Sequence, residues 1–222
     1  MTLQDRLDAF KADFEAGRPP YNVPSAVIAV MRRATAALRA SGQADRAIAA
    51  GDRAPAFALA DAGGHVHDST ALLRHGPLVL TFYRGVWCPY CNMELEALQA
   101  VLPDIRAAGA TLLAISPQTA VNSRKSVAKN GLGFPILVDP GNAVAASFGL
   151  RFALPDYLVD LYKSLKNDLP GFNGDPSWTL PMPARYVIGQ DGVVLHANVE
   201  PDYTRRPEPE ALLPWLRAAE HV

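Results

Sequence analysis

The two cysteines of the chain, Cys88 and Cys91, are separated by two residues and follow closely on an apolar segment, residues 78–83. Pro89 stands between them and is well suited to the first turn of a helix. The thiolate is the reactive form of cysteine, and the positive end of a helix stabilises it. A strand that leads into a helix at this spacing predicts a redox-active pair, with a disulfide between the two sulfurs within reach.

Three side chains beside the pair are expected to support its chemistry. Arg84 is close enough in sequence to add positive charge, and Trp87 and Tyr90 are expected to shield the site from water. The backbone amides of Tyr90 and Cys91 lie in the first helical turn, where they have no intrahelical acceptor. They are therefore available to stabilise a thiolate or a developing anion.

Two other interpretations of the cysteines are an inert buried pair and half of a zinc site. A structural zinc site needs two further Cys or His ligands. The chain has no other cysteine, and its histidines show no metal-ligand spacing: His65, His67, His75, His196 and His221. We therefore expect redox chemistry without a bound metal or other cofactor.

Composition narrows the class of protein and its partners. The 222 residues are 49% hydrophobic and carry a formal net charge of −1, which gives no indication of a nucleic acid or an anionic membrane as partner. No apolar run is long enough to cross a membrane. The first 20 residues are amphipathic and acidic and do not resemble a signal peptide. We expect a cytoplasmic protein, where a close cysteine pair is typically catalytic.

Residues 1–50 are expected to form an N-terminal helical extension. Apolar residues recur at helical spacing after Thr2, which is placed as an N-cap, and Ser25 is placed to cap a second helix over residues 26–40. Each helix has an apolar face and little within the extension on which to bury it. The helices are expected to pack either on the main domain or on a second subunit, so a homodimer is one of two arrangements left open.

Residues 51–222 predict an α/β domain with a mixed central sheet and helices on both faces. The almost continuously apolar segment 78–83 is typical of a strand buried on both faces. The helix after it is expected to keep Glu94 and Glu96 off its buried face. Residues 150–181 predict a long loop insertion that contains one helix, at 157–165, and a hairpin over 184–197 follows.

Three motifs carry a family resemblance. They are Gly51-x-x-Ala54-Pro55-x-Phe57-x-Leu59, the run from Phe82 to Cys91, and the segment from Trp178 to Ala184. Together they resemble the peroxiredoxins, the alkyl hydroperoxide reductase and thiol-specific antioxidant family, and most closely its branch with a Trp-Cys-Pro-Tyr-Cys motif. The resemblance covers about residues 51–198 and implies a thioredoxin-like fold.

The resemblance gives two assignments for the cysteines. The peroxiredoxin spacing places the peroxidatic cysteine at Cys91, with Cys88 where the family has a hydroxyl and Arg84 where it has a proline. The thioredoxin-like motif instead makes Cys88 the nucleophile and Cys91 the resolving residue. Pro183 aligns with the family's arginine and resembles the cis-proline that faces the cysteines in thioredoxins. Arg185 is expected to be a solvated strand residue.

Three activities follow from these features. The first is a thiol peroxidase that reduces hydrogen peroxide or organic hydroperoxides through a sulfenic acid and a Cys88–Cys91 disulfide. Its implied reductant is thioredoxin, glutaredoxin or glutathione. The second is a thioredoxin- or glutaredoxin-like thiol–disulfide oxidoreductase. The third is a non-enzymatic redox-sensing interaction module.

Overall fold

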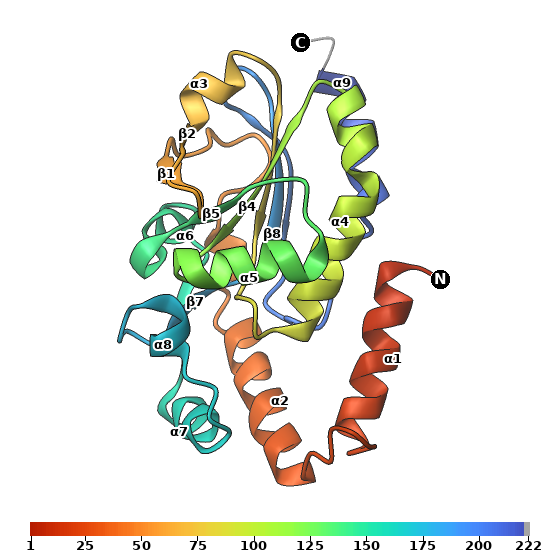
Figure 1. The fold of residues 1–222 in the computed structure, drawn as a ribbon, viewed down its shortest axis with the longest axis vertical. Helices are drawn as coiled ribbons and strands as arrows, with labels where there is room; N and C mark the ends of the chain where they lie inside the picture. The colour runs from red at the N-terminus through yellow and green to blue at the C-terminus, as the bar shows by residue number, and fades with distance from the viewer. Residues whose placement is uncertain (220–222) are drawn as a thin grey trace.

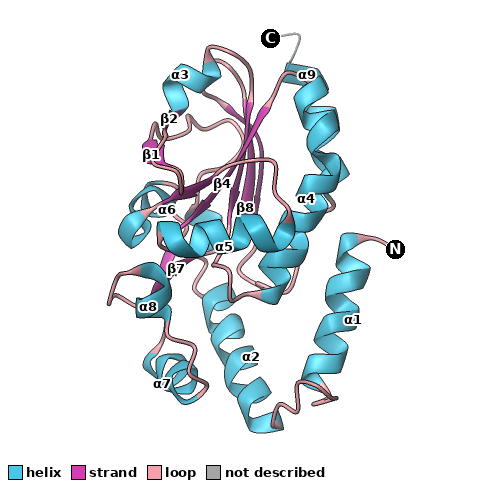
Figure 2. Cartoon of the chain, in the orientation of Figure 1, coloured by secondary structure: helices cyan, strands magenta, loops and turns pink. Residues whose placement is uncertain are grey.

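The computed structural model describes residues 1–219, and a five-stranded mixed sheet lies at its centre (Figures 1 and 2). The strand order is β5-β4-β3-β8-β9. Strands β3, β4 and β5 are parallel, and β8 runs antiparallel to both β3 and β9. The bounds are β3 (Leu78–Phe82), β4 (Thr111–Ser116), β5 (Ile136–Val138), β8 (Ala184–Ile188) and β9 (Val194–Val199). The predicted α/β class with a mixed, helix-flanked sheet is confirmed.

Strand β3 is buried throughout because a layer of structure covers each face of the sheet. Its side chains alternate between two cores, as the period of a strand requires. Val79 packs with α4 (Pro89–Ala107), whereas Leu80 and Phe82 pack on the opposite face with Phe148. The other helices that cover the sheet include α5 (Ala120–Asn130), α6 (Ala143–Ser147) and α9 (Leu213–Ala219).

The N-terminal extension forms two helices, α1 (Leu3–Glu15) and α2 (Ser25–Ala40), which diverge from the segment that joins them at the lower end of the molecule in Figure 1. Thr2 and Asp5 form the capping box of α1, whereas Pro24 rather than the expected Ser25 is the N-cap of α2. Leu3 and Leu7 of α1 enter the same core as α4, and Met31 and Ala34 of α2 pack against the cluster that contains Leu154 and Leu158. Both helices therefore bury apolar surface within this chain, and the homodimer stays a prediction.

Residues 150–181 contain more regular structure than the sequence predicts. Strands β6 (Arg151–Ala153) and β7 (Thr179–Pro181) pair antiparallel, and α7 (Asp156–Ser164) is the predicted helix. The expected loop over 170–176 begins instead as α8 (Leu169–Asn173). Its Pro170 occupies the first turn, where a missing N–H has no cost. The Asp168 carboxylate accepts a hydrogen bond from the Gly171 N–H at 3.2 Å.

The remaining elements lie at the periphery. They are β1 (Ala58–Ala60), β2 (Val66–Asp68), α3 (Ser69–Leu73) and the 3₁₀ turns η1 (Ala44–Arg46), η2 (Pro140–Asn142) and η3 (Pro209–Leu212). The last helical segment of the described chain begins as η3 and continues as α9 (Leu213–Ala219). Within residues 1–219, no helix combines the length and the apolar character needed to cross a membrane.

Candidate redox site

The cysteine motif lies where the central strand β3 meets the N-terminus of α4. Gly85 makes the turn between them with φ +140°, and a Cβ built on it would lie 2.7 Å from the indole nitrogen of Trp87. The Gly85 carbonyl accepts a hydrogen bond from the Cys88 N–H at 3.1 Å. A residue without a side chain is therefore required at Gly85, because any Cβ would displace Trp87.

Cys88 is the N-cap residue of α4, Pro89 is its first residue, and Cys91 lies one turn further along. The Cys88 side chain is 1% exposed and Cys91 is fully buried. The two residues are one helical turn apart, so their thiols influence each other's ionisation. The pair is thus held at the positive end of a 19-residue helix, as the sequence predicts.

A buried ion-pair cluster lies behind Cys91. Arg206 donates a hydrogen bond from Nη2 to the Cys91 sulfur at 3.4 Å, and its Nε donates to the Glu94 carboxylate. Arg185 donates to the other Glu94 oxygen at 2.8 Å. Two expectations are therefore wrong, since Arg185 is 1% exposed rather than solvated and Glu94 is 2% exposed rather than off the buried face. Arg185 and Glu94 can both be buried because each neutralises the charge of the other.

Arg84, which precedes the cysteine pair in the sequence, is a third buried cation. Its side chain is 4% exposed, and its Nη2 donates to the Tyr162 hydroxyl at 2.8 Å. Its guanidinium lies 4.7 Å from the ring centre of Trp87 and 4.2 Å from that of Tyr203. No carboxylate of residues 1–219 lies within ion-pairing distance of Arg84. The cation is held by aromatic faces and a phenol rather than by an acid.

These charges divide the two thiols into different protonation states. Burial opposes ionisation of Cys88, but the hydrogen bond from Cys91 and the charges of Arg84 and Arg206 lower the pKa of Cys88 to about 6. Burial, together with the hydrogen bond and negative charge of Cys88, raises the pKa of Cys91 well above its usual range. These interactions favour the thiolate form at Cys88 and the thiol form at Cys91.

The charge count supports the same division. The three buried guanidiniums of Arg84, Arg185 and Arg206 have one carboxylate, Glu94, within ion-pairing distance, so two positive charges are left without an ion-paired carboxylate. An uncompensated buried charge is costly, so ionised Cys88 acts as the counter-ion of the cluster.

The remaining predicted residues are placed as follows. Tyr90 is 5% exposed and packs edge-on to Phe10 of α1 at 5.0 Å, so it covers the pair from the side of the extension. Trp87 packs edge-on to Tyr162 at 5.9 Å. Pro183 is buried and directly precedes Ala184, which pairs with Phe82 at the end of β3 from which the cysteine motif follows. The expectation of a cis bond there is wrong, since the one cis peptide bond of residues 1–219 joins Pro19 to Pro20.

Polar side chains that the sequence does not single out hold the turn in place. Gln118 accepts a hydrogen bond from the Val86 N–H at 2.8 Å and donates to the Tyr83 hydroxyl at 2.6 Å. Asn92 donates to the Val86 carbonyl at 2.9 Å and accepts from Asn130 at 3.1 Å. The backbone before Cys88 is thus anchored by Asn92 of α4 and by Gln118 of the loop between β4 and α5. Asn92 lies only four residues after Cys88, whereas no sequence signal marks Gln118.

No group of three His, Cys, Asp or Glu side chains within residues 1–219 is arranged to hold a metal ion. His221, one of the histidines considered as a ligand, lies outside the described residues.

The model of the AhpC/TSA family matches residues 50–197, and the chain belongs to this family. The predicted family resemblance is confirmed, and the protein is an oxidoreductase with a thioredoxin-like fold. Assignment to the branch with a Trp-Cys-Pro-Tyr-Cys motif stays a prediction.

Relatives of two kinds are similar to this chain. The thiol-disulfide oxidoreductase ResA of Geobacillus thermodenitrificans is 29% identical over 126 residues, which are 56% of this chain and 71% of the relative. MT2597 of Mycobacterium tuberculosis, which is named as a peroxiredoxin, is 33% identical over 99 residues. These residues are 45% of this chain and 62% of the relative.

Solved structures show the same fold. Peroxidoxin BcpB from Mycobacterium tuberculosis superimposes with a TM-score of 0.60 at 23% identity, covering 77% of this chain and 97% of that one. A thiol:disulfide interchange protein DsbE from Chlorobium tepidum gives a TM-score of 0.55 at 21% identity, covering 78% and 98%.

Proposed function

We propose that this protein is a thiol peroxidase in which Cys88 attacks the hydroperoxide and Cys91 resolves the product. The observation that carries the proposal is the buried Cys88 at the N-terminus of α4, where the charges of Arg84 and Arg206 lower the pKa of its thiol. A sulfur with 1% exposure is far more accessible to a small hydroperoxide than to a disulfide on a protein surface. This geometry favours the thioredoxin-like assignment of the two cysteines over the peroxiredoxin spacing.

In the first step the Cys88 thiolate attacks the terminal oxygen of ROOH. A sulfur–oxygen bond forms, the O–O bond breaks, and RO⁻ leaves. The guanidiniums of Arg84 and Arg206 stabilise the negative charge that develops on the leaving oxygen. The Cys91 thiol, hydrogen-bonded to Cys88, supplies the proton that converts RO⁻ to ROH and becomes a thiolate itself.

In the second step the Cys91 thiolate attacks the Cys88 sulfenic acid. A disulfide forms and hydroxide leaves, which solvent protonates to water. One external dithiol, or two glutathione molecules, then reduces the disulfide by two exchange reactions and is oxidised to a disulfide in turn. The reductants of this proposal are thioredoxin, glutaredoxin or glutathione, and its location is the cytoplasm, where these reductants are maintained. No bound cofactor takes part in the proposed cycle.

The test is mass spectrometry of each single cysteine variant after brief exposure to hydrogen peroxide or cumene hydroperoxide. We expect Cys91→Ser to gain one oxygen on Cys88, and Cys88→Ser to react slowly. Rapid mixing of the reduced wild-type protein then gives the rate constant. A rate no faster than that of free cysteine would remove the peroxidase proposal.

A second candidate is a thiol–disulfide oxidoreductase, which the Cys-Pro-Tyr-Cys motif and the similarity to ResA favour. In this reaction Cys88 attacks a substrate disulfide, and Cys91 releases the substrate from the mixed disulfide. The discriminating assay is reduction of insulin or of a glutathione mixed disulfide. Fast reduction without fast peroxide consumption, and a trapped mixed disulfide in Cys91→Ser, would favour this candidate.

A further inference from the structure

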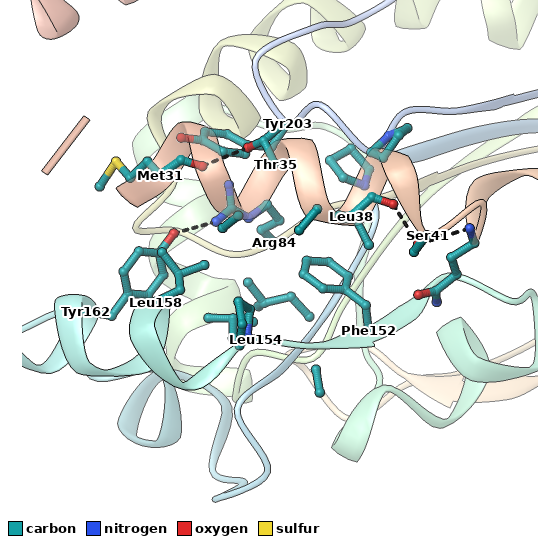
Figure 3. Close-up of a pocket in the computed structure, with 18 residues that line it drawn as sticks. Met31, Thr35, Leu38, Ser41, Arg84, Phe152, Leu154, Leu158, Tyr162 and Tyr203 are labelled. Atoms are coloured by element: carbon teal, nitrogen blue, oxygen red, sulfur yellow. Dashed lines mark hydrogen bonds between the residues drawn. The ribbon is translucent and has the colours of Figure 1, made fainter. Parts of the chain in front are cut away.

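A cavity of about 280 Å³ lies between α2 of the N-terminal extension and the β6–α7 segment, next to the redox site (Figure 3). Its walls are mainly apolar and include Met31, Ala34, Leu38, Phe152, Leu154 and Leu158. One wall comes from α2, which lies outside the region that matches the family. The cavity is therefore a feature that this chain's own extension completes.

Arg84 provides the polar end of the cavity. Figure 3 shows it between the α2 side chains and Tyr162, to which it is hydrogen-bonded. Its Nε is buried and has no hydrogen-bond partner within the described chain. The Tyr162 hydroxyl accepts from Arg84, so its own proton is available for an acceptor in the cavity. A buried guanidinium with unused donors beside an apolar chamber is suited to a ligand that has an anionic head and a hydrocarbon body.

We propose that this cavity binds a small aliphatic carboxylate, with the carboxylate on Arg84 and Tyr162 and the hydrocarbon chain between α2 and α7. A carboxylate matches the fork of donors on a guanidinium better than a neutral group does. The available space is adequate, because a cavity of ~150 Å³ holds benzene and this one is larger.

Such a ligand and the Cys88 thiolate compete for the same cation. Arg84 is one of the two charges that favour ionised Cys88, and a carboxylate on Arg84 opposes that ionisation. Coupling between two sites is reciprocal, so an ionised Cys88 must weaken carboxylate binding to the same extent. The carboxylate is thus a regulator of the thiol. The binding site is independent of the proposed peroxidase activity, and only the expected slowing of peroxide consumption rests on it.

The test is titration calorimetry of the full reduced chain at pH 8 with octanoate, and with octanamide as the neutral control. We expect saturable octanoate binding, octanamide weaker by at least about tenfold, and Cys88→Ser binding octanoate more tightly than wild type by about threefold or more. Ala34→Phe fills the cavity from α2 and should weaken octanoate binding by at least about tenfold. Ala29→Phe, an exposed position on the same helix outside the cavity, should leave binding unchanged.

Ala37→Phe, at an exposed position that also lines the cavity, provides a second block if Ala34→Phe does not fold. Absent octanoate binding, equal binding of octanoate and octanamide, or full binding by a folded blocking variant would each overturn the inference. If octanoate binds as expected but peroxide is not consumed, the proposed function fails and the ligand site remains. If peroxide is consumed but octanoate does not bind, the reverse holds.

Discussion

Replacing Arg84 by methionine tests whether this buried cation keeps Cys88 ionised. Methionine preserves much of the apolar volume of the side chain but removes the charge that has no carboxylate partner within residues 1–219. We expect the pKa of Cys88 to rise from about 6, because only Arg206 and the side-chain and backbone groups of Cys91 then oppose the effect of burial. Arg217→Met removes the same charge from an exposed position on α9 and is the matched control.

The expected magnitude follows from the protonation balance. With a pKa of about 6, roughly ten Cys88 sulfurs are ionised for each neutral one at pH 7. If loss of one of the two nearby charges raises the pKa to about 8, that ratio inverts, since each pKa unit is a factor of about ten. The rate of peroxide consumption at pH 7 should therefore fall by about tenfold through loss of thiolate alone.

The rate of peroxide consumption should fall further in Arg84→Met if Arg84 also stabilises the leaving oxygen. At about pH 9.5 Cys88 is ionised in both proteins, so the thiolate contribution disappears. The rate difference that remains there measures transition-state stabilisation, which for one such donor is commonly about 10²-fold or more. The two contributions are thus separated by one pH–rate profile.

The assay is ultraviolet absorbance of the thiolate as a function of pH, together with single-turnover peroxide kinetics across the same range. Circular dichroism checks that Arg84→Met is folded. Arg217→Met should follow the wild-type curves. If the pKa of Cys88 in folded Arg84→Met stays where it is in wild type, the electrostatic account of the site is refuted.

Three further predictions follow. Glu94→Gln leaves Arg185 and Arg206 buried without a carboxylate partner and should lower the free energy of unfolding by about 3 kcal/mol in denaturant titrations, whereas Glu96→Gln, at an exposed position, should change it little. Burial opposes ionisation of Cys88, but its neighbours lower the pKa of Cys88 in the folded protein to about 6. The ionised thiolate therefore contributes stability above the pKa that Cys88 has in the unfolded chain, and this contribution is lost as the pH falls to the folded pKa. The difference in unfolding free energy between wild type and Cys88→Ser should therefore grow from about pH 6 to about 8.5, by on the order of 3 kcal/mol, and a flat difference would contradict the assigned ionisation. Gly85→Ala brings a Cβ against Trp87 at a positive φ and should cost about 2 kcal/mol, with a shift in Trp fluorescence as the second measurement.

The sequence by itself determines the local part of this site. Cys88, Pro89 and Cys91 lie within one helical turn, so their mutual placement depends on short-range geometry that spacing reveals. The same holds for the buried strand before them, whose continuous apolar run and following glycine predict the strand-to-helix turn. The helix 157–165 and the hairpin over 184–197 were likewise predicted, because hydrophobic periodicity and turn residues are local signals.

The tertiary structure alone decides which sulfur ionises and what surrounds it. Arg206 lies 115 residues from Cys91, and no local pattern indicates that the two meet. Periodicity places Glu94 and Arg185 at the surface, because a charge on its own is rarely buried. They are buried because they form an ion pair with each other, although they are 91 residues apart in the sequence. Electrostatic interactions depend on distance in space and on desolvation, neither of which is encoded in the spacing of residues along the chain.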